Sequence, residues 1–247
     1  MRLTTTLLMI VVVLASLGTL PATADAVSLE ASADAHVMQT GGSDNTNNFG
    51  AETALLIKWN GLNASNRKLY VRFDLTGVNK ALLNGATFQM TSLWGSESSQ
   101  AGQTGNLFAQ VSALNDLDLG ESWDESTITY NNAPANDPGV NDFDPLRTTD
   151  LGTIGPYFRS STTVPGMVFS FSSQALLDAV QDDTNNILTL LMVQTPPNGF
   201  SSQWAARDHG TFEGPTLILT MVPEPQAIAL VGTGLAGLLA CARRKRK

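Results

Sequence analysis

Basic side chains gather in one short stretch of the sequence, with Tyr70 among them. Fifteen positions hold four of them: Lys58, Arg67, Lys68 and Arg72. Between residues 25 and 222 the chain has 8 Lys+Arg against 21 Asp+Glu, a net charge of −13, so these four are half of that region's cations. Cations beside a phenol ring can bind an acidic or hydroxyl-rich polymer by charge-assisted hydrogen bonds and stacking.

The residues from Lys68 to Leu75 alternate in polarity with period two. Even positions are polar or amphipathic and odd positions are apolar, which predicts a strand with one face on the core and the other in water. Lys68, Tyr70 and Arg72 then lie on the water-facing side. Because exposed charges contribute little to stability, the double variant Lys68→Ala/Arg72→Ala should have nearly the same melting temperature as the parent.

A second interpretation of the basic stretch needs no ligand. Acidic neighbours such as Asp74 and Glu52 can pair with the cations and leave a solvated face. If the run Ala54–Trp59 forms a hairpin with the strand that follows, Lys58 joins the same face. Both interpretations stay open on these residues alone.

Tryptophan gives further candidates. Trp204 lies three residues before Arg207 near the predicted last hairpin, where an indole and a guanidinium suit a sugar surface. Trp123 is expected to pack its own loop instead. Trp59 shares a strand face with Ile57, which predicts a place in the core.

One loop could hold a metal ion. Asp137, Asp142 and Asp144 supply its carboxylates, but their spacing does not match the EF-hand frame. We therefore expect an acidic loop without a bound ion and no cofactor, with a structural calcium as the alternative.

The sequence predicts that the protein is not an enzyme. It has two histidines, His36 and His209, and one cysteine, Cys241, and it lacks the nucleophile elbow, the P-loop and the His-Glu-x-x-His motif. His209 precedes a glycine and is expected in a turn. Carboxylates in a polar linker could form a glycosidase pair, although no pattern marks any of them as a buried acid: Asp116, Asp118, Glu121, Asp124 and Glu125.

Short strands must position these residues. The chain has 247 residues, 43% of them hydrophobic, which suits one domain of moderate size. Turn-forming residues separate the predicted strands: Ala54–Trp59, Leu69–Leu75, Ala86–Leu93, Leu107–Leu114, Val168–Phe171, Ile187–Val193 and Thr216–Met221. One short helix is predicted at Gln174–Val180. This pattern predicts an all-β antiparallel sandwich or jelly roll, and its acidity argues against nucleic-acid binding.

The two ends of the chain look like sorting signals. Arg2, a short apolar run and small residues near position 24 are typical of a secretory signal, so residues 1–26 are predicted to be removed by signal peptidase. At the other end Pro223-Glu224-Pro225 precedes an apolar run and a basic terminus, Arg243–Lys247. Basic residues stay on the cytoplasmic side, so the domain at 27–222 is expected outside.

The layout of residues 223–247 resembles the PEP-CTERM sorting signal of Gram-negative bacteria. The resemblance implies transient anchoring of a transmembrane helix in the inner membrane, removal of the tail by an exosortase, and release to the cell surface or beyond. A permanent anchor is the alternative.

The body resembles the DNRLRE domain, described as a jelly-roll carbohydrate-binding module of secreted bacterial proteins with alginate among its ligands. Four ordered segments carry the likeness: Asp34–Val37 with Asn45–Thr53, Arg67–Leu75, Trp123–Pro134, and Gln203–Asp208 with Gly214–Leu217. The basic surface implicated in that family corresponds here to Lys58, Arg67, Lys68 and Arg72. Tyr130 stands where the family has a second tryptophan.

The sequence therefore predicts an exported, non-catalytic protein that binds polysaccharide at the cell surface or in the extracellular matrix, with an acidic polysaccharide as one candidate ligand. The predicted glycan-binding residues are Lys58, Arg67, Lys68, Tyr70, Arg72, Trp204 and Arg207. A structural or adhesive matrix protein without a saccharide site is the alternative, and a polysaccharide lyase or hydrolase is a third hypothesis.

Overall fold

The computed structural model describes residues 25–39, 45–60, 65–93, 106–158, 165–195 and 201–222. The predicted signal peptide, residues 1–26, lies outside these ranges except for Asp25 and Ala26, which begin the first strand, and the predicted sorting tail from residue 223 lies outside them. Ala26–Met221 forms one compact unit. Among the described residues, no helix has the length and apolar character that crossing a membrane requires.

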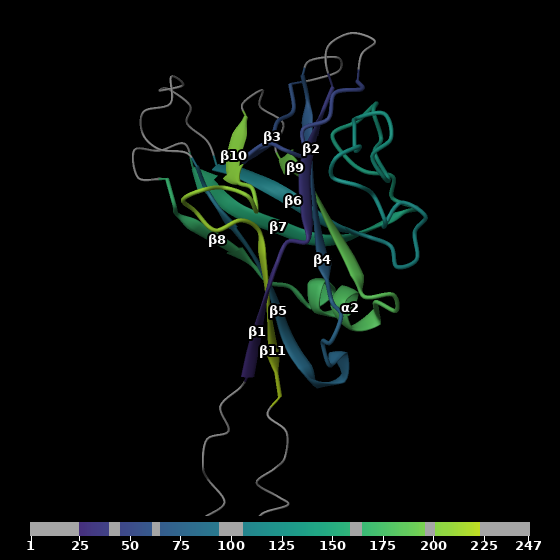
Figure 1. Ribbon diagram of the computed structural model, residues 1–247, viewed down its shortest axis with the longest axis vertical. Helices are drawn as coiled ribbons and strands as arrows, with labels where there is room; N and C mark the ends of the chain where they lie inside the picture. Colours follow the sequence, from purple (N-terminus) through teal and green to yellow (C-terminus); the bar gives the residue numbers. More distant parts are fainter. Residues whose placement is uncertain are drawn as a thin grey trace, which may run out of the picture. The chain divides into compact units, whose positions relative to one another are not determined.

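The described chain is built mainly of β-strands (Figure 1). They are β1 (Asp25–Glu30), β2 (Ala33–Met38), β3 (Ala54–Ile57), β4 (Arg67–Asp74), β5 (Leu83–Thr91), β6 (Asn106–Leu114), β7 (Thr148–Phe158), β8 (Val168–Phe171), β9 (Ile187–Thr195), β10 (Ser202–Ala205) and β11 (Thr216–Met221). A four-stranded sheet has the order β1-β11-β5-β8, a five-stranded sheet has the order β2-β4-β9-β6-β7, and β10 pairs with β3. The strands pair antiparallel, which confirms the predicted all-β sandwich.

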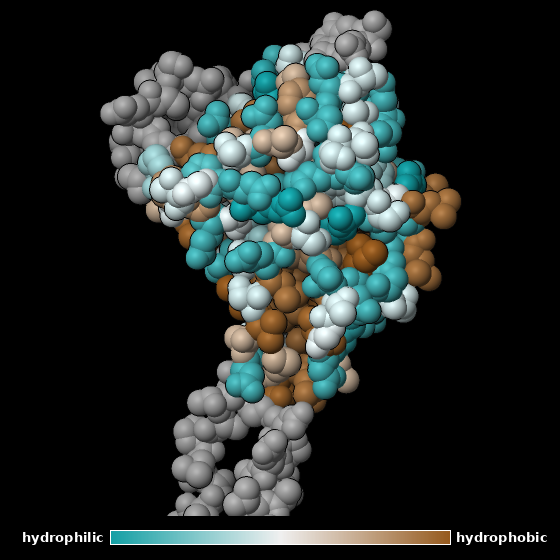
Figure 2. All heavy atoms as spheres, viewed as in Figure 1, coloured by the Kyte–Doolittle hydropathy of each residue, from teal (hydrophilic) through white to brown (hydrophobic). Residues whose placement is uncertain are grey.

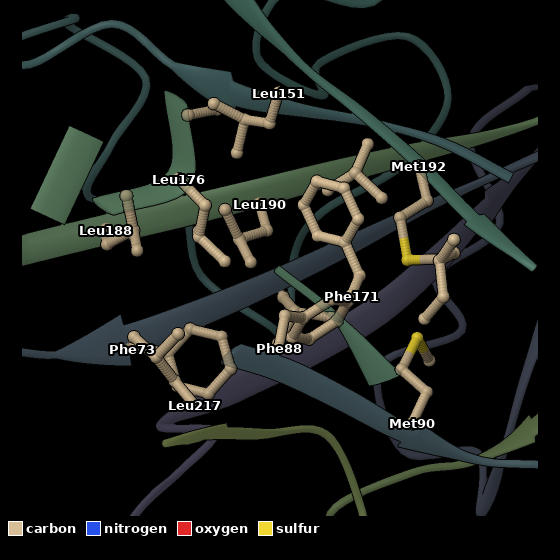
Figure 3. Close-up of a cluster of buried hydrophobic side chains, with 14 of the residues drawn as sticks. Phe73, Phe88, Met90, Leu151, Phe171, Leu176, Leu188, Leu190, Met192 and Leu217 are labelled. Atoms are coloured by element: carbon tan, nitrogen blue, oxygen red, sulfur yellow. The ribbon is translucent and has the colours of Figure 1, made fainter. Parts of the chain in front are cut away.

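The main core lies between the four-stranded and the five-stranded sheet, as the alternation predicts (Figure 3). On β4 the odd positions are buried there, and on β5 Ala86, Phe88 and Met90 face them. Phe73 of β4 and Phe88 of β5 meet edge to face with ring centroids 6.1 Å apart. Aromatic pairs prefer this geometry, because the positive edge of one ring meets the negative face of the other.

The helix α2 (Gln174–Asp182) follows β8 and closes part of this core. Ser173 caps it, since the Ser173 side chain accepts a hydrogen bond from the backbone N–H of Leu176. Leu176, Leu177 and Val180 form its buried face, at the spacing the sequence showed.

The hairpin considered for residues 54–75 is reduced to a single pair of residues. β3 pairs with β10, and β4 pairs with β2 and β9. The two segments share the isolated antiparallel bridge between Lys58 and Arg67. Four strands were not among those predicted from the sequence: β1, β2, β7 and β10.

Residues 115–147, called here the β6–β7 connection, cover the outer face of the five-stranded sheet. A second buried cluster lies beneath them, built from Ala33, Ala35, Val37, Tyr70, Leu114, Leu191 and Val193 of the sheet together with Trp123, Ile128, Tyr130, Ala133, Ala135 and Phe143 of the connection. This face of the sheet was predicted to lie in water. That prediction is wrong, because aromatic residues of the connection need burial and take the sheet as their partner.

Lys68 was predicted to face water, but beneath the β6–β7 connection it is 0% exposed. Its ammonium donates hydrogen bonds to the backbone carbonyls of Asp137, at 2.7 Å, and of Asp142. The same group lies 5.2 Å from the centre of the Phe143 ring. Burial lowers the pKa of Lys68 to about 8, against the opposing charges of Asp137 and Asp142.

Tyr70 and Arg72 hold the connection at two more points. The Tyr70 hydroxyl donates to the Pro134 carbonyl at 3.2 Å, and burial raises the pKa of Tyr70 well above its ordinary value. Arg72 donates to the Trp123 carbonyl, and its guanidinium lies 5.2 Å from the Trp123 ring. Three successive outward side chains of one strand thus bind three segments of the connection.

These contacts reverse the expectation for the double variant Lys68→Ala/Arg72→Ala. The variant leaves the carbonyls of Asp137, Asp142 and Trp123 without their donors, and each buried unsatisfied group costs about 1–3 kcal/mol. We expect urea denaturation to show a free energy of unfolding lower by about 3 kcal/mol or more. Lys58→Ala is the control and should change it by about 0.5 kcal/mol at most. A double variant as stable as the parent would show that the connection stays in place without these cations.

Candidate functional site

The structure buries three of the seven predicted glycan-binding residues and packs a fourth, Arg72, against the fold. Lys68 and Tyr70 are buried beneath the β6–β7 connection, and Arg72 is half-buried against Trp123. Trp204 is 1% exposed and meets Phe169 edge to face, with centroids 5.7 Å apart. The predicted surface with Tyr70 as a stacking plate is therefore wrong, because its side chains are used to hold the fold.

Lys58 and Arg67 are half-buried and lie opposite each other in the bridge. Burial lowers the pKa of Arg67. Its charge also acts on His36, whose pKa falls to about 3, mainly because His36 is buried. The His36 ring stacks on Phe49 at 4.8 Å, so this end of the basic stretch borders a packed, neutral histidine.

Two tryptophans behave as predicted. Trp123 is buried in its connection, and its indole N–H donates to the Thr189 hydroxyl at 3.2 Å. Trp59 is buried as well, and its backbone N–H donates to the Gln194 side chain.

Arg207 is the predicted residue that stays at the surface, with its side chain 34% exposed. Three contacts fix its position: its guanidinium lies 2.9 Å from the Glu125 carboxylate, donates to the Ser32 carbonyl at 2.6 Å, and its backbone N–H donates to Asp34 at 2.7 Å. Glu125 also accepts from the Asp34 backbone N–H. An arginine held in this way presents its remaining N–H groups in a defined direction.

Asp34 lies beneath this group on β2 and is 1% exposed. Burial raises the pKa of Asp34 to about 7, while its hydrogen bond from the Arg207 backbone opposes the rise and the charge of Glu125 adds to it.

A pocket of about 350 Å³ opens beside Arg207. The loop 207–216 forms most of its wall, and Ser28 and Glu30 of β1 complete it. The two ends of the loop lie against each other at Arg207 and Gly214. A Cβ placed on Gly214 would lie 2.4 Å from the Arg207 Cα, so only glycine fits there. Such a small, partly polar concavity suits a small ligand or one unit of a polymer.

Phe212 and His209 form the aromatic part of the pocket. Their rings stack with centroids 5.4 Å apart and an interplanar angle of 19°. His209 lies in a turn, as predicted, because its Nδ1 accepts from the backbone N–H groups of Thr211 and Phe212. Phe212 also packs on Gly166, where an added Cβ would lie 2.7 Å from the ring. The ring is therefore fixed and half-buried.

The loop for which a structural calcium was the alternative turns its carboxylates to separate hydrogen bonds. Each caps its own turn: Asp137 accepts from the Gly139 N–H at 3.0 Å, and Asp144 accepts from the Leu146 N–H at 3.0 Å. Asp142 accepts from its own neighbour Phe143. The cation that this loop binds through its backbone is the ammonium of Lys68.

Another acidic group could hold a metal ion. The carboxylates of Asp116, Glu121 and Asp183 approach within 4.8 Å of one another. Lys80 already forms an ion pair with Asp183, and Asn185 donates to Glu121. Burial raises the pKa of Glu121, which the sequence did not mark as a buried acid. The cluster thus has internal partners for its charges.

Sequence reasoning missed Phe212, Glu30 and Glu213, which line the pocket with Arg207. One signal was present: Phe212 is an aromatic residue in the glycine-flanked segment 210–214, where a ring has no predicted core to enter.

The pKa of Asp34 leads to a pH prediction. Between its unfolded value of 3.8 and its folded value of about 7, the folded chain binds the extra proton, so this contribution to stability falls as pH rises through that window. Asp34→Asn cannot titrate. We expect the Asn variant to gain stability relative to the parent as pH rises from about 4 to about 7, in urea denaturation at stepped pH. The lowered pKa of His36 makes stability rise with pH, but this contribution is the same in both proteins and cancels in the comparison. Parallel pH curves would contradict the raised pKa.

Comparison with known proteins agrees with this description. The model of carbohydrate-binding module family 96 matches residues 25–145, which include β1 to β6 and most of the β6–β7 connection. The model of the PEP-CTERM protein-sorting motif matches residues 222–245. No curated protein matches the chain. Residues 25–145 therefore resemble a carbohydrate-binding module of family 96, and the C-terminus carries a PEP-CTERM protein-sorting motif.

Proposed function

We propose that this protein is exported and binds polysaccharide, without catalysis, at the cell surface or in the extracellular matrix. The pocket at loop 207–216 is the observation that carries the proposal beyond the family match. It combines a fixed aromatic ring, a positioned arginine and exposed carboxylates. Ser28 and Glu30 of its wall lie within the residues that match the family model, and loop 207–216 belongs to the same compact unit. The strand order of both sheets supports a jelly-roll topology for that module.

The chemistry of the pocket suits a sugar. A pyranose ring has an apolar C–H face, which can lie on Phe212, and a rim of hydroxyls. Arg207 can donate to those hydroxyls, and Glu30 and Glu213 can accept from them. Of the predicted glycan-binding residues, Arg207 is the one we retain for this pocket.

The absence of catalysis is part of the proposal. Three of the carboxylates that could have formed a glycosidase pair have structural partners: Asp118 pairs with Arg147 at 2.6 Å, Glu125 pairs with Arg207, and Asp124 caps the turn at Ser126. A general acid must be free to exchange its proton with a substrate.

Export and processing complete the proposal. Residues 1–26 would direct secretion and be removed by signal peptidase, which leaves the domain 27–222 and the tail 223–247. The match to the PEP-CTERM motif supports recognition by an exosortase after transient anchoring of an apolar helix in the inner membrane. Pro223, Glu224 and Pro225 are the proposed recognition residues.

One observation favours the alternative, a structural or adhesive matrix protein. Leu117, Leu119 and Leu146 of the β6–β7 connection are 67%, 100% and 86% exposed. Asn115 bonds to the carbonyl of Leu146, which ties the two leucine-bearing turns together. Figure 2 shows hydrophobic residues projecting at the edge of the molecule where Figure 1 draws this connection. Exposed apolar groups of this kind are typical of contact surfaces.

Phe212→Ala tests the pocket. Loss of the ring removes its contact with a sugar, and we expect the affinity for the best-bound polysaccharide to fall about tenfold, since an aromatic contact is worth about 0.5–1.5 kcal/mol beyond its buried area. Affinity electrophoresis or calorimetry measures it. Phe49→Ala is a matched control, because Phe49 also stacks on a histidine but does not line the pocket. Equal affinity of the Phe212 variant and the parent would remove the pocket from the function.

Replacement of Pro223, Glu224 and Pro225 by alanine tests the sorting signal. We expect the full-length protein to stay in the membrane fraction, because the tail keeps its apolar run but loses the proposed recognition residues. Immunoblotting of membrane and medium fractions in an exosortase-containing host measures it. Normal release of a shortened protein would contradict the role of these three residues.

A further inference from the structure

The outer face of the four-stranded sheet carries a row of hydroxyl and amide groups. Ser170 of β8, Gln89 of β5 and Thr216 of β11 are partners in register, and all three point away from the core. The Gln89 amide donates to the Ser170 hydroxyl at 3.0 Å. This bond leaves the Gln89 carbonyl and one N–H for a further partner.

A second row runs beside the first. The hydroxyls of Thr87 and Ser172 lie 2.8 Å apart, and Thr87 pairs with Ile218 of β11. These side chains are half-buried or exposed. Ile218 adds an apolar spot between polar groups, which matches the alternation of C–H patches and hydroxyls along a sugar chain.

The rows lead into the pocket. Thr216 ends the first row and lines the pocket together with Ser28 and Glu30, which project from the outer side of β1. The Phe212 ring lies against Gly166, two residues before β8, so it reaches the other edge of the same sheet. Four strands at spacings of about 4.8 Å give a path of about 14 Å across the sheet, which is longer than one sugar ring.

This face has no excess of positive charge among its described residues. Of the eight cations between residues 25 and 222, five are bonded inside the domain: Lys68, Arg72, Lys80, Arg147 and Arg207. The pocket itself contributes Glu30 and Glu213 against Arg207, which is already paired with Glu125. A polyuronate would meet carboxylates here and be repelled.

We propose that the outer face of the four-stranded sheet is a binding surface for a neutral, hydroxyl-rich polysaccharide, whose chain crosses the rows at Gln89 and Thr87 and enters the pocket at Phe212. The proposal rests on the proposed function and specifies its site and ligand class. Recognition then depends on hydrogen bonds and stacking and is insensitive to salt, because no net charge is neutralised on binding.

The test compares neutral and acidic polymers on the full-length protein, purified in a detergent without a sugar headgroup. The neutral polymers are dextran, hydroxyethylcellulose and galactomannan, and the acidic polymers are alginate and pectate. We expect binding to a neutral polymer with equal affinity at low and high salt, and weaker or no binding to the polyuronates. Thr87→Val/Gln89→Ala should lower the affinity about tenfold, the loss expected from one or two hydrogen bonds.

Gln110→Ala is the matched control. Gln110 is also half-buried and points outward, but from β6 of the five-stranded sheet, so its variant should bind as the parent does. Melting temperatures show whether each variant folds.

Three results would overturn the proposal. Preferred, salt-sensitive binding to a polyuronate contradicts the ligand class. Neutral binding that Thr87→Val/Gln89→Ala leaves unchanged contradicts the face. Both results leave the proposed function in place, whereas binding to no polymer at all removes the proposed function together with this inference.

Discussion

The buried ammonium of Lys68 is the interaction on which the arrangement of this domain depends. A charge that is fully removed from water must be satisfied by oriented partners, and the carbonyls of Asp137 and Asp142 are those partners. The β6–β7 connection is bound to β4 through this group. Tyr70 and Arg72 lie on the same face of β4 and bind the connection as well. Together with Lys68 they hold this long polar segment over the five-stranded sheet.

Because the connection covers only the five-stranded sheet, the two sheets differ in how much of their outer face is accessible. In the five-stranded sheet, β4 and β9 are buried on both faces, between the main core and the second cluster. The four-stranded sheet keeps its outer face, and the loop 207–216 rises beside it to form the pocket. Cations of this acidic domain are used mainly inside the fold, so a ligand at the proposed face would meet hydroxyls, amides, carboxylates and one aromatic pair. The geometry supports recognition by shape and hydrogen bonds rather than by net charge.

Much of this fold could be predicted from the sequence. Period-two alternation located β4 and assigned its inner face correctly, and the helical spacing of Leu176, Leu177 and Val180 located α2. The outer face of β4 could not be assigned, because alternation distinguishes two faces but does not say what covers the polar one. The aromatics Trp123, Tyr130 and Phe143 within a polar connection were the available signal, since three large rings need a surface to pack on.

The candidate site was harder to predict. Arg207 was found through a family motif, but Trp204, three residues earlier, turns into the core. Phe212 and Glu30 are far apart in the sequence and meet because β1 and β11 are neighbours in the sheet. No local pattern encodes such a juxtaposition, which arises only from sheet order. The contact between the buried Asp34 of β2 and the backbone N–H of Arg207 likewise joins residues far apart in the sequence.

The neighbouring positions of the first and last strands have a mechanical consequence (Figure 1). β11 lies between β1 and β5 and leads directly into the C-terminal tail. Before the proposed removal of the tail, tension between it and a bound polymer would enter the domain at Met221 and leave it near Thr216, along a single strand. The ladder bonds of β11 run across that direction, so they would resist together in shear rather than open one after another. Leu217 and Leu219 of β11 are buried in the main core, so a pull of this kind would load the core packing together with the ladder bonds, and strand and core would resist it as one unit.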